Sequence, residues 1–192
     1  MRTKDEQKRQ ALFKATVKLV NEIGFAASSV SKIAREAGVS PSTLYVFFEN
    51  KEDLLVSTYV ELKLGLAGAL LEGFDRSLPI RDIIKNVWYC VFEYISNNRE
   101  AYDYMEQFSN SPYSSLVDKN LIEKEYTPFI NVINAGIRQK IIKDVDIFII
   151  AAFIFKPLSQ LANPRFCLDM DMEMDEQKLE LAFDMAWDAI KL

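Results

Sequence analysis

Residues 28–53, SSVSKIAREAGVSPSTLYVFFENKED, carry the pattern that decides the fold. Ser29 stands where a helix N-cap belongs, and Gly38 stands where a helix end favours a left-handed residue. Between these two positions the apolar residues repeat with the i, i+3, i+4, i+7 spacing of one helix face, namely Val30, Ile33, Ala34 and Ala37. The stretch therefore begins with a short amphipathic helix that ends in a tight turn.

A second short helix follows the turn at once. Ser40 offers its cap, and Pro41 sits in the first turn, where its missing N–H costs nothing. Leu44 and Phe48 are four residues apart and can pack inward on the first helix. The remaining side chains then face partly or wholly outward: Pro41, Ser42, Thr43, Tyr45, Val46 and Phe47.

The outward face of this second helix distinguishes two interpretations. Two short helices can be plain core pieces. However, Val46 and Phe47 beside Tyr45 would form an unfavourable apolar surface if nothing bound to it. An inward pair with small, hydroxyl and aromatic residues outside is what a recognition helix requires, so the pattern favours a DNA-binding helix-turn-helix.

The same residues carry a family resemblance. The pattern I-A-x-x-A-G-V-S-x-x-T-L-Y-x-x-F-x-x-K-E-x-L, which begins at Ile33 and ends at Leu54, resembles the N-terminal domain of the tetracycline-repressor (TetR) family of bacterial regulators. Gly24-Phe25 and Ser29-Val30 fit it as well. The resemblance covers about residues 8 to 55, and it implies a dimer that binds a palindromic DNA operator and responds to a small effector.

The resemblance also implies the DNA contacts. Ser42 and Thr43 would hydrogen-bond base edges, and Pro41 and Val46 would touch thymine methyls. Tyr45 would contact a phosphate or a methyl, and Phe47 would pack on the sugar backbone. Lys32 and Lys51 would hold phosphates, and Ser29 completes the expected set. Two departures from the family pattern weaken phosphate contacts. Val46 and Phe47 replace residues that usually hydrogen-bond, and Glu49 stands where a basic residue is frequent.

Composition limits the other function classes. The 192 residues are 49% hydrophobic, with six Gly and six Pro, which supports a folded all-α protein. The chain has no histidine, so the commonest general base and zinc ligand are missing; we expect no enzyme activity, no metal and no cofactor. The net charge of −5 divides unevenly. Residues 1–55 contain nine Lys and Arg and seven Asp and Glu, which gives a net charge of +2. The remaining residues therefore carry −7. A positive N-terminal part on a negative remainder is the charge distribution expected of a protein with a basic DNA-binding head.

Sequence also indicates where the chain resides. The N-terminus is charged and shows no signal peptide, and the longest apolar run, residues 147–155, is far shorter than the roughly 20 residues of a membrane span. Cys90 and Cys167 are more typical of free thiols than of a disulfide. We expect a cytoplasmic protein with no membrane partner.

The remaining helices follow from apolar periodicity and breaks. We expect a helix that stops at Gly24, followed after the helix-turn-helix by helices over residues 51–72, 80–97, 99–109, 115–142, 144–161 and 175–192. Asn50 and Asp144 are the expected caps, and Pro128 and Pro157 the expected bends. About nine helices result, with a DNA-binding domain at 1–50 and an effector-binding and dimerisation domain at 51–192.

Two residue sets in the second domain are candidate sites. Aromatic and apolar residues in its middle helices predict an effector pocket for an aromatic or elongated apolar ligand, the alternative being plain core: Trp88, Phe92, Ile95, Tyr102, Met105, Phe108, Tyr126 and Phe129. The last two helices are too apolar for chain ends and predict a four-helix dimer interface, unless they close the chain's own core: Phe148, Ala152, Phe155, Leu158, Leu161, Phe183, Ala186 and Ile190.

Five acidic residues have the spacing of the ligands in a calcium-binding loop, namely Asp169, Asp171, Glu173, Asp175 and Glu180. Met174 stands where that loop needs glycine, so we interpret residues 165–174 as an irregular solvated loop. The sequence as a whole predicts a DNA-binding regulator, a repressor released by a small hydrophobic or aromatic effector. The alternative is a protein of the same fold that is controlled by a protein partner.

Overall fold

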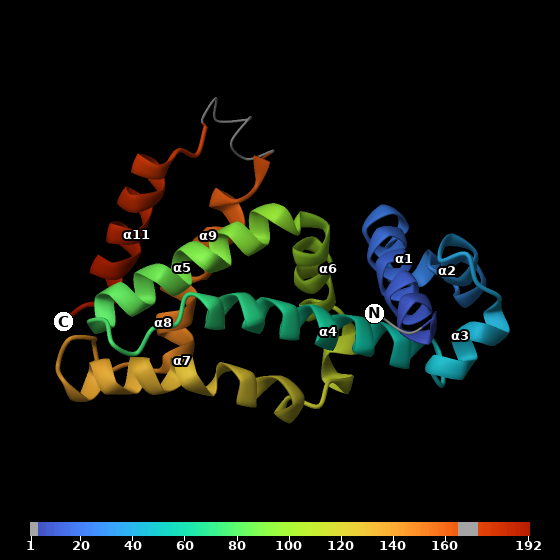
Figure 1. Ribbon diagram of the computed structural model, residues 1–192, viewed down its shortest axis with the longest axis horizontal. Coiled ribbons are helices and arrows are strands. Elements are labelled where there is room, and N and C mark those ends of the chain that lie inside the picture. The colour runs from blue at the N-terminus through green and yellow to red at the C-terminus, as the bar shows by residue number, and fades with distance from the viewer. Residues whose placement is uncertain (1–3, 165–172) are drawn as a thin grey trace. The chain divides into compact units, whose positions relative to one another are not determined.

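The computed structural model describes residues 4–164 and 173–192, and within them it is all-α apart from one isolated bridge between Ile142 and Lys191 (Figure 1). Cys167, Asp169, Asp171 and most of the predicted irregular loop lie outside the described residues. The chain forms two compact units. The first comprises Met1–Lys63 and Glu100–Leu121, and the second comprises Leu64–Arg99 and Ile122–Leu192.

The first unit contains the helix-turn-helix. Helix α1 (Lys4–Ala27) precedes α2 (Val30–Glu36) and α3 (Pro41–Phe47), and α4 (Lys51–Glu72) begins in this unit and ends in the second (Figure 1). Gly24 interrupts α1 with a φ of 77°, which places the break where the sequence predicted it. One core cluster joins α1, α2, α3 and the start of α4, and its members are Leu12, Phe13, Ala15, Ile33, Ala34, Leu44, Phe48 and Leu54.

Helix α6 (Arg99–Ser109) and the 3₁₀ helix η1 (Pro112–Leu116) also belong to the first unit, apart from Arg99. Tyr104 and Phe108 of α6 are fully buried in a second cluster with Val17, Val20 and Leu55. The Tyr104 hydroxyl donates to the Leu55 carbonyl at 2.9 Å, and burial raises the pKa of Tyr104. Helix α6 from Glu100 onward therefore belongs to the same compact unit as α1 and the start of α4, and the boundary expected near residue 50 stays a prediction.

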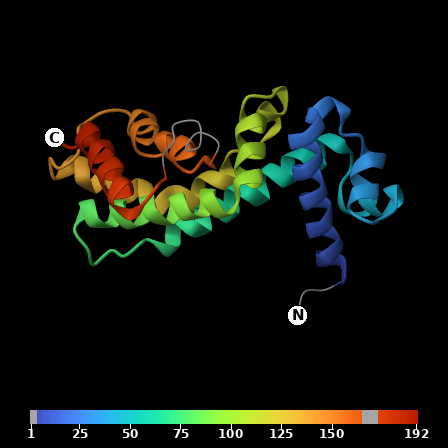
Figure 2. The same cartoon turned by 90° about the horizontal axis from the view of Figure 1, so that it is seen from above.

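The second unit is a helical bundle. It contains the end of α4, α5 (Ile80–Asn97), α7 (Asn120–Arg138, from Ile122), α8 (Ile147–Ile154), α9 (Lys156–Leu161) and α11 (Glu176–Ile190). Helix α11 packs on α5 and α8, as both views of the cartoon show (Figures 1 and 2). The Trp88 indole of α5 is buried and donates to the Ile154 carbonyl at 2.8 Å, which ties α5 to the end of α8.

Two predicted helices differ from those observed. The helix predicted over 115–142 is α7, which starts at Asn120 because Pro112–Leu116 forms η1 instead. It ends at Arg138, where Lys140 adopts a φ of 57° and the Ile141 N–H bonds back to Gly136, the pattern of a Schellman end. The structure keeps Pro128 inside α7.

The helix predicted over 144–161 is divided into α8 and α9. Asp146, not Asp144, caps α8, because its carboxylate accepts from the Phe148 N–H at 2.8 Å. Pro157 lies in the first turn of α9, where its missing N–H costs no hydrogen bond. The helices predicted over 51–72, 80–97 and 99–109 have the same bounds in the structure. Helix α1 extends beyond the predicted stop at Gly24 to Ala27, and α11 spans Glu176–Ile190 instead of 175–192.

Helix α4 is the one helix in residues 4–164 and 173–192 that is long and apolar enough to cross a membrane, by length and composition only. The sequence prediction rested on unbroken apolar runs and did not identify it. Leu54 and Leu55 are buried in the first unit, and Ala67 and Leu70 are buried in the second. Core helices of folded proteins pass the same test, so this property is weak evidence for a span.

Candidate nucleic-acid interface

The turn between α2 and α3 is held by two caps and one glycine. The Ser29 hydroxyl accepts from the Lys32 N–H, and the Ser40 hydroxyl accepts from the Thr43 N–H. Gly38 has a φ of 68°, a backbone conformation in which a residue with a side chain would be strained. The sequence predicted all three features, because each depends on local backbone chemistry alone.

Helix α3 has one buried side and one exposed side. Leu44 and Phe48 are 0% and 4% exposed and pack into the first core cluster. Tyr45 and Val46 are 55% and 78% exposed, Pro41 and Ser42 are exposed, and Thr43 and Phe47 are half-buried. The face predicted to meet DNA is thus open in this unit.

The hydroxyl groups on this face are linked to one another. Ser40 shares a hydrogen bond with Ser42 at 2.7 Å and another with Thr43 at 2.9 Å. This cluster fixes the rotamers of Ser42 and Thr43 at the start of α3. A hydroxyl keeps spare acceptor capacity after one bond, so the cluster orders these groups without removing them from recognition.

Both lysines predicted to hold phosphates contact protein carbonyl groups. The Lys51 ammonium donates to the Phe25 carbonyl at 2.6 Å, and the Lys32 ammonium donates to the Ala27 carbonyl at 3.1 Å. These carbonyls lie at the C-terminal end of α1, after the break at Gly24. A cation at a helix C-terminus is favoured by the helix dipole. The sequence analysis did not predict this role, although Gly24 marked a helix end whose last carbonyl groups need hydrogen-bond donors.

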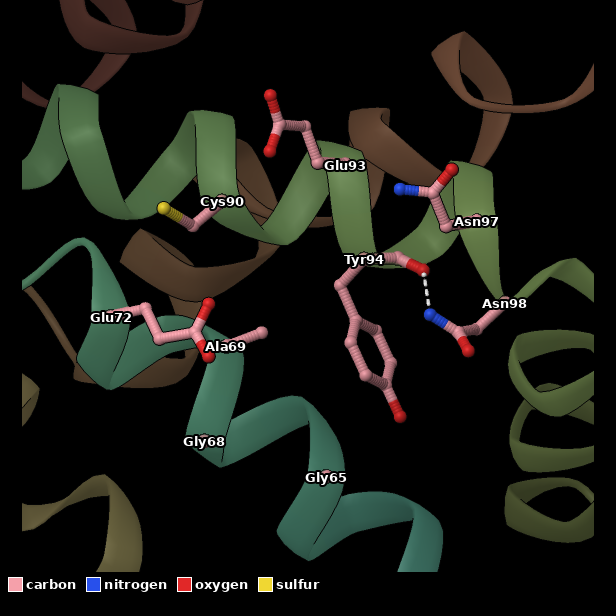
Figure 3. A pocket seen from close by; sticks show the side chains of 9 residues that line it. All are labelled: Gly65, Gly68, Ala69, Glu72, Cys90, Glu93, Tyr94, Asn97 and Asn98. Atoms are coloured by element: carbon pink, nitrogen blue, oxygen red, sulfur yellow. Dashed lines mark hydrogen bonds between the residues drawn. The ribbon is translucent and has the colours of Figure 1, made fainter.

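A groove of about 330 Å³ lies in the second unit between α4 and α5 (Figure 3). Gly65, Gly68 and Ala69 form the α4 wall. A Cβ atom added at Gly65 would lie 2.8 Å from the Tyr94 hydroxyl, so the glycine leaves room for that side chain. Polar residues complete the lining, namely Glu72, Glu93, Asn97 and Asn98, together with Cys90. Burial and the nearby carboxylates of Glu93 and Glu72 raise the pKa of the Cys90 thiol. The sequence analysis predicted none of these residues as the lining of a pocket.

The eight residues predicted to line an apolar pocket are divided between the two units, and none of them lines the groove. Tyr102, Met105 and Phe108 are buried in the first unit, where Phe108 stacks on Tyr59 with ring centroids 4.4 Å apart. In the second unit Trp88 packs edge-on against Phe183, and Phe129 packs against Phe155. Trp88, Ile95 and Phe129 are buried, while Phe92 and Tyr126 are half-buried. Their pocket role stays a prediction.

The residues predicted for a dimer interface also fall into two groups. Leu158, Phe183, Ala186 and Ile190 are buried in the second unit's own core, and Phe155 and Leu161 are half-buried. Phe148, at 81% exposure, and Ala152 lie on the open side of α8. The sequence reasoning missed the other exposed apolar residues of α8 and α11, which are Ile149, Phe153, Leu181 and Met185.

Comparisons with known proteins match both the N-terminal and the C-terminal part of the chain. Residues 12–58 match "Bacterial regulatory proteins, tetR family", and residues 79–191 match "Tetracyclin repressor-like, C-terminal domain". The chain is 33% identical to a TetR family transcription regulator from Marinobacter aquaeolei VT8, whose crystal structure superposes with a TM-score of 0.88. That likeness covers 100% of this chain and 99% of the other.

Two further proteins resemble the chain over most of their length. An uncharacterized HTH-type transcriptional regulator of Haemophilus influenzae is 24% identical over 183 residues, 95% of each chain. The transcriptional regulator FadR from Bacillus subtilis, solved in complex with stearoyl-CoA, is 21% identical with a TM-score of 0.68, covering 92% of this chain and 95% of the other. The chain therefore belongs to the TetR family and is a DNA-binding transcriptional regulator of the helix-turn-helix type.

Proposed function

We propose that the protein is a cytoplasmic repressor that binds a palindromic operator as a homodimer and is released by a small effector. The observation that carries this proposal is the open face of α3, where Tyr45 and Val46 are 55% and 78% exposed beside ordered hydroxyls. An exposed apolar surface on a well-packed short helix implies a partner. In this fold family the partner is the major groove of DNA.

The dimer is supported by the open apolar strips of α8 and α11, two helices that pack on each other. Phe148, Ile149 and Phe153 on α8, with Leu181 and Met185 on α11, are all about half exposed or more. A second copy would cover them in a four-helix arrangement. Two α3 helices would then reach half-sites about 34 Å apart, one turn of DNA.

The effector would bind in the second unit and be small and apolar or aromatic. The aromatic residues of α5 and α7 support this chemistry, as does the stearoyl-CoA bound by the FadR relative. The groove between α4 and α5 is polar, so an apolar effector would enter between the packed aromatic side chains instead. A ligand shifts the DNA-binding equilibrium only by its different affinity for the two states.

Close packing of the predicted pocket residues favours one alternative, control by a protein partner. Trp88, Ile95 and Phe108 are at most 1% exposed and leave no space beside them for a ligand unless the helices move. The DNA-binding role is the same under either form of control.

The test is selection of bound sequences from random duplex DNA with the full-length protein, followed by fluorescence anisotropy on the enriched site. We expect a palindromic site whose binding falls with rising salt, and loss of binding in Tyr45→Ala and Thr43→Ala with the fold intact. Leu116→Ala, an equally exposed apolar truncation outside α3, serves as the matched control. Enrichment of no site, or unchanged binding by both α3 variants, would overturn the proposal.

A further inference from the structure

The centre of the open face of α3 is an aliphatic side chain. At about 100° per residue, Val46 points opposite to the direction midway between Leu44 and Phe48, the two buried residues. Its 78% exposure is the highest among the large hydrophobic side chains that the structure describes in the first unit. If α3 enters a groove with its open face inward, Val46 lies at the centre of the surface that faces the bases.

The polar chemistry available on α3 is limited. The helix reads PSTLYVF, with no Arg, Lys, Asn, Gln, Asp or Glu. Those are the side chains that recognise the edges of guanine, adenine and cytosine. Arg, Lys, Asn and Gln do so through bidentate or cationic contacts, and Asp and Glu accept a hydrogen bond from cytosine. Helix α3 therefore lacks the means to select a G·C pair through a strong hydrogen-bonded contact.

The two aliphatic hydroxyls of the open face are held at one end of the helix. Ser42 and Thr43 both bond to Ser40, at 2.7 and 2.9 Å, in the first turn. Val46 lies one turn further along, beyond this cluster. The group it offers to a base pair is therefore apolar, and in the major groove only thymine presents an apolar group, the C5 methyl.

We propose that Val46 is a specificity-determining residue that selects thymine, so that each operator half-site places a thymine methyl against it. This inference rests on the proposed DNA-binding function and adds the base that α3 prefers. Burial of the methyl against Val46 supplies the discrimination, and the exposed Tyr45 ring beside it extends the apolar surface. Base pairs that face the second turn of α3 are accordingly A·T pairs.

The experiment uses the full-length protein and the operator found by selection. Each thymine of one half-site is replaced singly by deoxyuridine, which removes only the methyl, and the dissociation constant is measured by anisotropy. At one position we expect about fourfold weaker binding, the effect of one buried methyl group. Replacing the same thymine by cytosine weakens binding, and 5-methylcytosine at that position restores part of it.

Protein variants connect the effect to the side chain. In Val46→Ala, thymine and deoxyuridine operators bind equally, because the methyl has lost its contact. Val145→Ala, the same truncation at an exposed position of the second unit, keeps the fourfold preference.

Three results would overturn the inference while leaving DNA binding intact. They are selected half-sites without a shared thymine, deoxyuridine without effect at every position, and a Val46→Ala variant that still prefers thymine fourfold. Selection of no DNA at all would instead overturn the proposed function itself.

Discussion

Single residues whose role follows from backbone chemistry were the most predictable. Gly38 was identified from sequence because a helix end followed at once by a second cap needs a left-handed residue, and its φ is 68°. The role of Lys51 was not predictable in the same way. Its partner, the Phe25 carbonyl, lies 26 residues earlier in the chain, and only the folded packing of α1 on α4 brings them together.

Two glycines give opposite predictions for the same substitution. Gly38→Ala forces a side chain into the left-handed region and should lower the free energy of unfolding by about 1 kcal/mol. Gly68→Ala lies in α4 with no atom within 4 Å of the added Cβ, so it should raise that free energy by about 0.5–1 kcal/mol. Urea denaturation followed by circular dichroism measures both. Shifts of the same sign would contradict the assignment of Gly38 to a left-handed turn.

Lys51 provides a second prediction at the residue scale. Lys51→Met keeps the aliphatic stem and removes the bond to Phe25, so the free protein should lose about 1.5 kcal/mol of stability in urea. Lys14→Met, at an exposed position of α1, should leave stability unchanged. If Lys51 acts only on phosphates, stability will stay constant and the salt dependence of DNA binding will instead fall by about one charge.

Among whole elements, the sequence predicted helices by their caps and breaks. It failed where two signals competed. Asp144 and Asp146 both precede the apolar run, and both are good caps, so composition alone does not choose between them. In the structure Asp146 is the cap, because its carboxylate accepts from the Phe148 N–H and α8 begins at Ile147. Similarly, Pro157 marked a bend, and in the structure α8 ends at Ile154, whose carbonyl accepts a hydrogen bond from the Trp88 indole N–H.

The choice of cap gives a matched pair of variants. Asp146→Ala removes the carboxylate that accepts from the Phe148 N–H and should cost about 1 kcal/mol of stability. Asp144→Ala, two residues earlier, removes the same chemical group from a position that does not cap the helix. It should therefore leave the stability unchanged. Thermal unfolding of both variants decides between the two aspartates. A larger loss in Asp144→Ala would mean that the helix begins where the sequence first placed it.

At the scale of the whole molecule, the sequence predicted that the last helices carry more apolar residues than chain ends usually do. It did not predict which side of each helix is exposed. Periodicity identifies the apolar positions of a helix, and α8 and α11 have apolar residues on nearly every side. Which of them are buried depends on where α5 and α9 pack. Phe183 and Ile190 are therefore core residues, and Phe153 and Met185 are exposed at 55% and 68%.

The open sides of α8 and α11 yield the last prediction. Phe153→Glu with Met185→Glu puts two charges into the apolar strips without touching the buried side, so the variant should fold and sediment as a monomer at micromolar concentration. Because two linked α3 helices bind far more tightly than one, operator affinity should fall on the order of 100-fold. Leu116→Glu, at an exposed position of the first unit, should remain dimeric with near-normal affinity. A double variant that stays dimeric would place the interface on another surface of the chain, and the spacing of the two half-sites would then have to be derived anew from that surface.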